Sequence, residues 1–238
     1  MRRSEINDIM REAIDFLQYM NFLLPPFAFW SSDQWKQKGE ECREIVDQQL
    51  GWDITDFGSN DFERMGLFLF TIRNGTLAEL QKKNGRVYAE KILITRAGQV
   101  TPAHFHHQKM EDIINRGGGN LILQLWNSTD DDLLADTDVT VVTDGVKISL
   151  PGGGIVRLEP GESITLPQRL YHKFWGEDGC GTVLVGEVSR VNDDRVDNKF
   201  FENVGRFPTI VEDENPLHLL YSDYATFYSH AGISHAHY

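Results

Sequence analysis

The sequence predicts an all-β protein, a sandwich or small barrel of short strands, preceded by a helical segment. From about residue 65 onward, short apolar runs alternate with turn formers at intervals of roughly ten residues. That part of the chain lacks the alternation of strands and long helices that is typical of βαβ units. Over residues 4–22, apolar residues recur instead at the three- and four-residue steps of a helix.

The N-terminal segment is expected to hold two helices. Residues 4–22 place apolar side chains on one helical face, with Ser4 as N-cap, and Pro25–Pro26 ends this helix. A second helix is expected over residues 32–50, with Gly51 as its C-terminal stop. The nearby aromatic residues are expected to pack on the main domain, or alternatively to line a pocket or subunit interface: Phe27, Phe29, Trp30 and Trp35.

Several runs after this segment are predicted to be strands. Each combines β-branched, aromatic or aliphatic residues with a turn former at its end. The chain is interpreted as one domain, because no repeat and no long linker divides it. Residues 1–64 would form a helical segment packed on the barrel, and residues 65–238 the barrel and a C-terminal tail. In order, the runs are LFLFTIRNG, VYAEKILITRAG, NLILQLWN, VTVVTDG, VKISLPGGG, IVRLEPG, ESITLP and GTVLVGEVSRV.

The composition argues against several classes of partner. The 238 residues carry 23 basic and 36 acidic side chains, a net charge of −13, without a clustered basic stripe, so nucleic acid is not expected. No run approaches the roughly 18 apolar residues of a membrane span, and the first residues lack the apolar core of a signal peptide. Cys42 and Cys180 lie far apart, which favours a reduced, cytoplasmic protein, with a single disulfide as the alternative.

The segment GQVTPAHFHHQKMEDIINRGGG is the most informative for chemistry. His104 and His106 are two positions apart, so on a strand their imidazoles point to the same face. A turn near His107 is expected to bring Glu111 back alongside them within one hairpin. His172 is expected to close the site from across the barrel. Three imidazoles and one carboxylate would form a divalent-metal site with two positions open on a six-coordinate ion.

This mixed nitrogen and oxygen donor set suits Mn²⁺, Fe²⁺, Co²⁺ or Ni²⁺, and also Zn²⁺. Two open positions suit the neighbouring oxygens of an open-chain sugar, or a substrate together with dioxygen. The spacing therefore leaves three alternatives: a sugar isomerase, an Fe²⁺ dioxygenase and a non-catalytic sugar-binding protein. An isomerase needs a metal that polarises the carbonyl and a base that shuttles the C–H proton, with a metal-assisted hydride shift as the rival pathway.

Further side chains are candidates for the chemistry. Lys109 shares the parity of Glu111 and would therefore lie next to the metal ion. The ion would lower the pKa of Lys109, whose nitrogen could stabilise an oxyanion. The alternative is an ordinary solvated surface lysine. Glu187 and Glu202 are candidate bases, or else exposed carboxylates. Arg206 either binds substrate hydroxyls or pairs with the acidic run EDE that follows it, the ion pair being favoured.

Two groups of histidines are expected to stay outside the site. His230, His235 and His237 lie at the extreme C-terminus, where chains are often disordered, and are not expected to be functional. The parity of His107 opposes that of His106, so His107 is expected to face away from the metal.

The spacing of these residues resembles the two motifs of the cupin superfamily. The first motif, G-x5-H-x-H-x4-E-x6-G, is matched by Gly98, His104, His106, Glu111 and Gly118. The second, G-x5-P-x-G-x2-H-x3-N, is matched by Gly161, Pro167 and His172. Two positions depart from the second motif: Arg169 stands where glycine is usual, and Gly176 where asparagine is usual. These departures bear on the geometry of the turn and leave the metal ligand His172 in place. The resemblance implies a cupin-type double-stranded β-helix, a jelly-roll barrel.

A narrower resemblance covers nearly the whole chain. The runs MNFLLPPFAFW, HFHHQKMEDIINRGGG and RFPTIVEDENP are similar to the D-lyxose isomerase family of cupins. The resemblance implies a metal-dependent ketol-isomerase that interconverts D-lyxose and D-xylulose, and in some members D-mannose and D-fructose. It also implies one divalent ion per chain, usually Mn²⁺, and often a homodimer. It carries metal ligation over onto His104, His106, Glu111 and His172.

Overall fold

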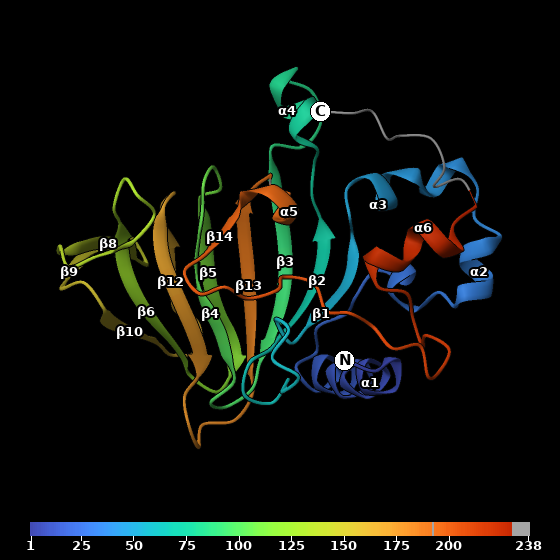
Figure 1. Cartoon of the computed structure of the whole chain (residues 1–238), viewed down its shortest axis with the longest axis horizontal. Helices are drawn as coiled ribbons and strands as arrows, with labels where there is room; N and C mark the ends of the chain where they lie inside the picture. Colours follow the sequence, from blue (N-terminus) through green and yellow to red (C-terminus); the bar gives the residue numbers. More distant parts are fainter. Residues whose placement is uncertain (192, 230–238) are drawn as a thin grey trace.

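The computed structural model describes residues 1–191 and 193–229. Two curled antiparallel sheets face one another (Figure 1). The helices that gather at one side of them are α1 (Arg3–Tyr19), α2 (Ser32–Lys36), α3 (Arg43–Asp47) and α6 (Tyr224–Phe227). This arrangement confirms the jelly-roll barrel with an N-terminal helical segment. His230, His235 and His237 lie outside the described residues. Within the described ranges, no helix combines the length and the apolar character needed to cross a membrane.

The strands of each sheet come from distant parts of the chain. The eight-stranded sheet has the order β1 (Gly51–Thr55), β2 (Leu67–Arg73), β3 (Tyr88–Thr95), β13 (Val183–Arg190), β5 (Glu111–Gly118), β11 (Ser163–Leu166), β8 (Val139–Thr143) and β9 (Val146–Leu150). The six-stranded sheet has the order β10 (Gly154–Leu158), β6 (Leu121–Ser128), β12 (Leu170–Gly176), β4 (Val100–His106) and β14 (Asn198–Phe200), with β7 (Leu134–Ala135) paired to β6. Because successive strands often change sheets, residues far apart in sequence meet inside the barrel.

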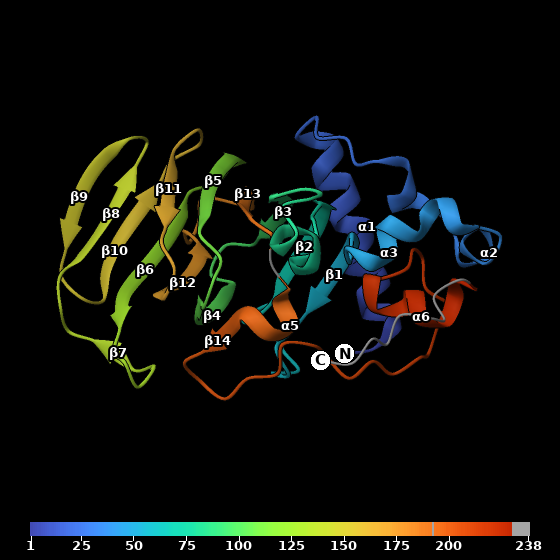
Figure 2. The same ribbon diagram turned by 90° about the horizontal axis from the view of Figure 1, so that it is seen from above.

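Helix α1 (Arg3–Tyr19) covers the outer face of the strands at one end of the larger sheet (Figure 2). Its buried side chains, such as Met10, pack in one cluster with Phe68 of β2 and Ile92 of β3. The alternate residues Leu69 and Leu93 point the other way, into the barrel core. Both faces of β2 and β3 are therefore buried, which explains why the run LFLF is apolar throughout and does not alternate.

The acidic run in the C-terminal tail holds the beginning of α1. The Arg3 guanidinium is 1% exposed and contacts the carboxylates of Glu212 at 2.7 Å and Asp223 at 2.9 Å. Ser4, expected as the N-cap, lies inside the helix, and its hydroxyl donates to the Asp213 carboxylate at 2.8 Å. The tail therefore fixes the helix through charge pairs as well as through apolar packing.

Replacing Arg3 by alanine is expected to lower the free energy of unfolding by about 3 kcal/mol, because the largely buried carboxylate of Asp223 would lose its counter-ion. Urea unfolding followed by circular dichroism measures this change. Arg11→Ala is the matched control, since the exposed pair of Arg11 and Asp8 should contribute less than about 1 kcal/mol. Equal losses of unfolding free energy in Arg3→Ala and Arg11→Ala would show that the buried ion pair stabilises the fold no more than the exposed one.

The second expected helix, over residues 32–50, is wrong as a continuous element. Gly39 adopts an extended backbone (φ −96°, ψ −165°) and interrupts it. Gly51, expected to stop the helix, instead begins β1 with a positive φ of 113°. Because β1 pairs with β2, the larger sheet includes residues before 65; the division at residue 65 stays a prediction. The helical elements apart from α1 are η1 (Pro26–Phe29), α2 (Ser32–Lys36), η2 (Glu40–Cys42), α3 (Arg43–Asp47), α4 (Leu77–Gln81), α5 (Asp194–Asp197), η3 (Tyr221–Asp223) and α6 (Tyr224–Phe227).

The aromatic residues near these short helices mostly pack as expected. The ring of Phe27 lies 5.5 Å from that of Phe70 in β2. Trp35 is buried, with its ring 4.4 Å from that of Tyr224. Phe29 is 42% exposed. In the described part of the chain, none of the four predicted aromatic residues lines the cavity presented next.

Candidate functional site

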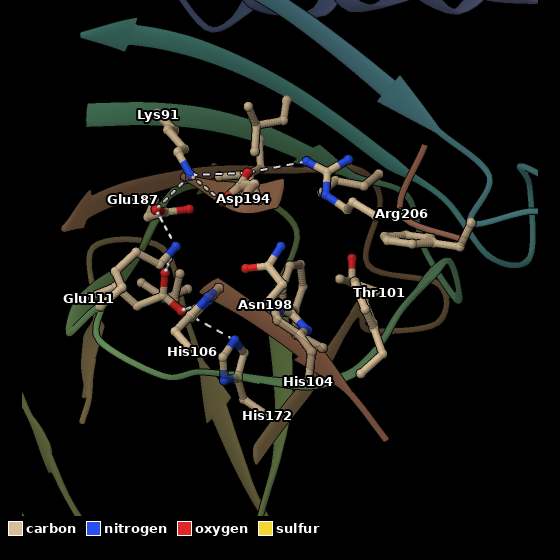
Figure 3. A pocket seen from close by; sticks show the side chains of 18 residues that line it. Lys91, Thr101, His104, His106, Glu111, His172, Glu187, Asp194, Asn198 and Arg206 are labelled. Carbon is tan, nitrogen blue, oxygen red and sulfur yellow. Dashed lines mark hydrogen bonds and ion pairs between the residues drawn. The ribbon is translucent and has the colours of Figure 1, made fainter. Parts of the chain in front are cut away.

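A cavity opens inside the barrel between the two sheets. It encloses about 430 Å³, its mouth included. Part of its wall is apolar, from residues such as Leu69 and Phe174, and charged and polar groups converge on the rest, a composition typical of small-molecule sites. The polar lining residues are Lys91, Thr101, His104, His106, Lys109, Glu111, His172, Glu187, Asp194, Asn198 and Arg206 (Figure 3).

Three buried histidines from two neighbouring strands form one wall of this cavity. β4 supplies His104 and His106, and β12 supplies His172, which is the direct register partner of His104. Their ligand nitrogens all lie within 4.8 Å of one another. A buried group of this kind could hold a metal ion.

Glu111 reaches the histidines from the opposite sheet. It is the first residue of β5, and residues 107–110 carry the chain across from β4. The expected hairpin is therefore wrong, because β4 and β5 do not pair with each other. The expected position of His172 is also wrong, because β12 lies beside β4 and not across the barrel. Nevertheless, Glu111 Oε1 lies 3.4 Å from His106 Nε2 and 3.2 Å from His172 Nε2.

The hydrogen bonds of two imidazoles test whether these residues fit a metal. The Nδ1–H of His104 donates to Pro102 O at 2.8 Å, and that of His172 donates to Leu170 O at 3.0 Å. In the neutral rings, Nε2 then carries a lone pair on the side of the cavity. For His172 this nitrogen lies 3.2 Å from Glu111 Oε1, and a cation bound to both atoms, either a proton or a metal ion, would satisfy the pair. The donor set therefore fits a cation.

Charges and burial favour the protonation states that metal binding needs. Burial lowers the pKa of His104 well below its ordinary value, and the imidazoles of His172 and His106 lower it further. Burial alone would raise the pKa of Glu111, but Lys109 and His106 hold it well below its usual range. A neutral imidazole and an ionised carboxylate are the forms that ligate metals.

Lys109 is buried and is not the solvated surface lysine of the alternative interpretation. Its Nζ lies 2.6 Å from Glu111 Oε2 and 2.8 Å from Glu187 Oε1. Burial alone would lower the pKa of Lys109, but these two carboxylates raise it above its usual value. A metal ion beside Lys109 would lower its pKa, as expected from the sequence, but the carboxylates of Glu111 and Glu187 act in the opposite direction.

The charged groups continue as a row of alternating sign along the cavity wall. Lys91 Nζ lies 3.4 Å from Glu187 Oε1 and 3.3 Å from Asp194 Oδ1. Arg206 lies 3.3 Å from Asp194 Oδ2 and 2.5 Å from Asp53 Oδ2. Burial alone would raise the pKa of Asp194, but Lys91 and Arg206 hold it well below its usual range. Helix α5 thus brings an ionised carboxylate to the site.

The remaining sequence candidates separate into two groups. Glu187 is buried in β13 and faces the cavity, and Arg206 lines it as well. The favoured pairing of Arg206 with the acidic run is wrong, because that run lies against α1. Glu202 is exposed and is not among the lining residues, so the structure does not bring it to the other candidates. His107 is exposed, as its parity predicted.

Sequence reasoning missed several residues of the cavity. Lys91 carried a usable signal, since it is the lone lysine of the apolar run YAEKILIT and shares the parity of Leu93. Thr101 carried none, because an irregularity of β4 determines where its side chain points. Asp194 and Asn198 lie in a segment without clear periodicity, so local patterns could not place them.

Comparison with known proteins relates this geometry to a family. The family model described as D-lyxose isomerase matches residues 1–224. The chain is 50% identical over 228 residues to the D-lyxose/D-mannose isomerase of Escherichia coli O157:H7, which covers 95% of this chain and 100% of that protein. It is 49% identical over 228 residues to the D-lyxose/D-mannose isomerase of Serratia proteamaculans, with 95% and 99% of the two chains covered.

A solved structure supports the same fold at lower similarity. The L-ribose isomerase of Cellulomonas parahominis with L-ribose superposes with a TM-score of 0.58, covering 89% of this chain and 98% of that one. The two are 18% identical, so this likeness shows the fold alone. The family model and the two closely similar relatives cover nearly the whole chain, and the protein therefore belongs to the D-lyxose isomerase family.

Proposed function

We propose that the protein is a metal-dependent aldose–ketose isomerase that interconverts D-lyxose and D-xylulose, and also D-mannose and D-fructose. One observation carries the proposal: a buried three-histidine group lies in the same cavity as a lysine–glutamate pair suited to proton transfer. The names of the two relatives support the choice of sugars.

His104, His106, Glu111 and His172 are the proposed ligands of one divalent ion per chain, Mn²⁺ in the first instance. Co²⁺, Fe²⁺, Ni²⁺ and Zn²⁺ suit the same donors. When bound, the ion supplies a Lewis acid that polarises the sugar carbonyl and stabilises negative charge on its oxygens. The proposal is supported by the convergence of the four side chains and by the pKa values of His104 and Glu111, both held well below their ordinary range.

Glu187 is the proposed base. Its Oε1 is held by Lys109 Nζ at 2.8 Å and by Lys91 Nζ at 3.4 Å. Two ammonium groups therefore orient the carboxylate at the cavity wall; Figure 3 labels Glu187 and Lys91. In this position it would take the proton from C2 of the aldose and deliver it to C1, which yields the ketose. A hydride shift would take no proton from carbon, so a carboxylate directed at C1 and C2 favours the proton-transfer pathway.

Lys109 is the proposed proton donor to the sugar oxygens. An ammonium group has three N–H donors, and two of those of Lys109 face Glu111 and Glu187. The third can donate to a sugar oxygen and assist the transfer of a proton between O1 and O2. The raised pKa of Lys109 keeps the group an ammonium ion, which can hydrogen-bond to the sugar oxygens and stabilise negative charge on them.

The direct test is incubation of the Mn²⁺-loaded protein with D-lyxose under exclusion of oxygen. We expect D-xylulose to form, and deuterium placed at C2 of D-lyxose to be lost partly to solvent, because a base exchanges its proton. Complete retention of the label at C1 would instead support a hydride shift. Failure to form a ketose from any pentose or hexose would contradict the isomerase, and a requirement for oxygen would support the dioxygenase.

We also propose that the protein works in the cytoplasm. Support comes from the two cysteines, Cys42 and Cys180, which are free thiols in the structure, as a reducing compartment would keep them. The homodimer that the family resemblance implies stays a prediction.

A further inference from the structure

An irregularity in β4 turns one more polar side chain toward the histidines. His172 of β12 pairs with His104, and Phe174 pairs with Thr101, so two steps on β12 match three on β4. This is a β-bulge, and it reverses the parity of the residues that precede it. Thr101 would otherwise point away from the face of His104, but it lines the cavity instead. Pro102, which has no N–H to contribute to the ladder, lies within the bulge.

The hydroxyl of Thr101 is buried in the cavity wall without a partner. The residue is 2% exposed, and its Oγ1 has no hydrogen-bond partner among the described residues. Buried polar atoms are nearly always hydrogen-bonded, because leaving one unpaired costs free energy. In Figure 3 the side chain lies on the side of the cavity nearest to Arg206, and its oxygen points into the open space.

Asn198 presents a second such atom from another strand. It begins β14 and pairs in register with His106, which places its side chain at the cavity. Its Oδ1 is buried and has no hydrogen-bond partner in the described part of the protein. An amide oxygen only accepts hydrogen bonds, so the matching group on a ligand must be a donor such as a hydroxyl.

We propose that Thr101 Oγ1 and Asn198 Oδ1 bind hydroxyls of the sugar and thereby set the substrate preference. The inference rests on the proposed function, because the histidines, Lys109 and Glu187 occupy the reacting end of the cavity. Each sugar hydroxyl both donates and accepts, so it can satisfy either atom. A site that pairs with a hydroxyl strongly rejects the analogue that lacks it, since its own polar atom is then left unpaired.

The variants Thr101→Val and Asn198→Ala test this inference. The first keeps the shape of the side chain and removes only its hydrogen-bonding group. For each metal-loaded variant we expect the affinity for D-arabinitol, the alditol of D-lyxose that cannot isomerise, to fall about tenfold or more by calorimetry. We expect KM for D-lyxose to rise more than kcat falls. Metal content should equal that of the native protein.

Thr95→Val is the matched control. Thr95 in β3 also has a buried hydroxyl without a partner in the described ranges, but it does not line the cavity. Native affinity for D-arabinitol is therefore expected in this variant. A similar loss in Thr95→Val would overturn the inference, because it would reflect a general effect of removing a buried hydroxyl.

The remaining outcomes also decide. Unchanged D-arabinitol binding in both cavity variants would overturn the inference. Loss of the metal from these variants would also overturn it, because the two residues would then act by supporting the metal site. Failure of the native metal-loaded protein to bind D-arabinitol at millimolar concentration would overturn it as well. Binding does not require turnover, so these results are distinguishable from a failure of the isomerase assay, which would contradict the proposed function.

Discussion

Replacing Glu187 by glutamine is expected to lower kcat for D-lyxose by about 10²–10⁴-fold while metal content stays native. The amide keeps the size of the side chain and still accepts a hydrogen bond from Lys109, but it cannot take a proton from carbon. KM should change little, because binding of the sugar does not depend on proton transfer. The measurement is steady-state formation of D-xylulose at several D-lyxose concentrations, alongside metal analysis of the same samples.

Glu202→Gln is the control for this experiment, because it makes the same chemical change at the other candidate base. Glu202 is exposed and outside the cavity lining, so we expect a native rate. A native rate in Glu187→Gln together with a large loss in Glu202→Gln would assign the base to Glu202. It would also require the segment after β14 to reach the cavity during the reaction.

Replacing His104 by alanine is expected to weaken binding of the divalent ion by more than about 100-fold. Losing a group that only orients a ligand costs 10–100-fold, and loss of a direct ligand should exceed that. The Nδ1–H of His104 is held by Pro102 O, so this ring is fixed for ligation before any ion arrives. Calorimetric titration of the metal-free native and variant proteins with Mn²⁺ measures this loss of affinity. The rate of ketose formation should fall in parallel.

His107→Ala is the matched control for His104→Ala. This histidine directly follows β4, but its side chain is exposed, on the other side of the strand from the metal site. Its removal should leave metal affinity and turnover at native levels. If the two variants lost metal equally, the proposed ligand set would be wrong.

Local patterns were sufficient for the class of fold because strand periodicity is local. The run LFLFTIRNG predicted β2, and ESITLP predicted β11. The order of the strands depends on contacts between distant residues, such as the pairing of β12 with β4, and no local pattern records it. The expected helix over residues 32–50 does not form as one element, because Gly39 adopts an extended backbone within it.

Some residues of the candidate site could be placed from the sequence, and others could not. Parity correctly placed His104 and His106 on one face, because side chains on a regular strand alternate. The same rule misplaces Thr101, because the bulge in β4 breaks the alternation. The partners of Arg206 were also unpredictable, since Asp53 and Asp194 come from the first strand and from helix α5. Only the folded chain brings these charges together.

Metal occupancy and turnover, measured on the same preparations of native protein, test the central account most directly. The account predicts one divalent ion per fully loaded chain, with D-xylulose formation from D-lyxose rising in proportion to occupancy. Chelation should abolish turnover and Mn²⁺ should restore it, but not in His104→Ala. Full turnover by protein stripped of divalent metal would contradict the account.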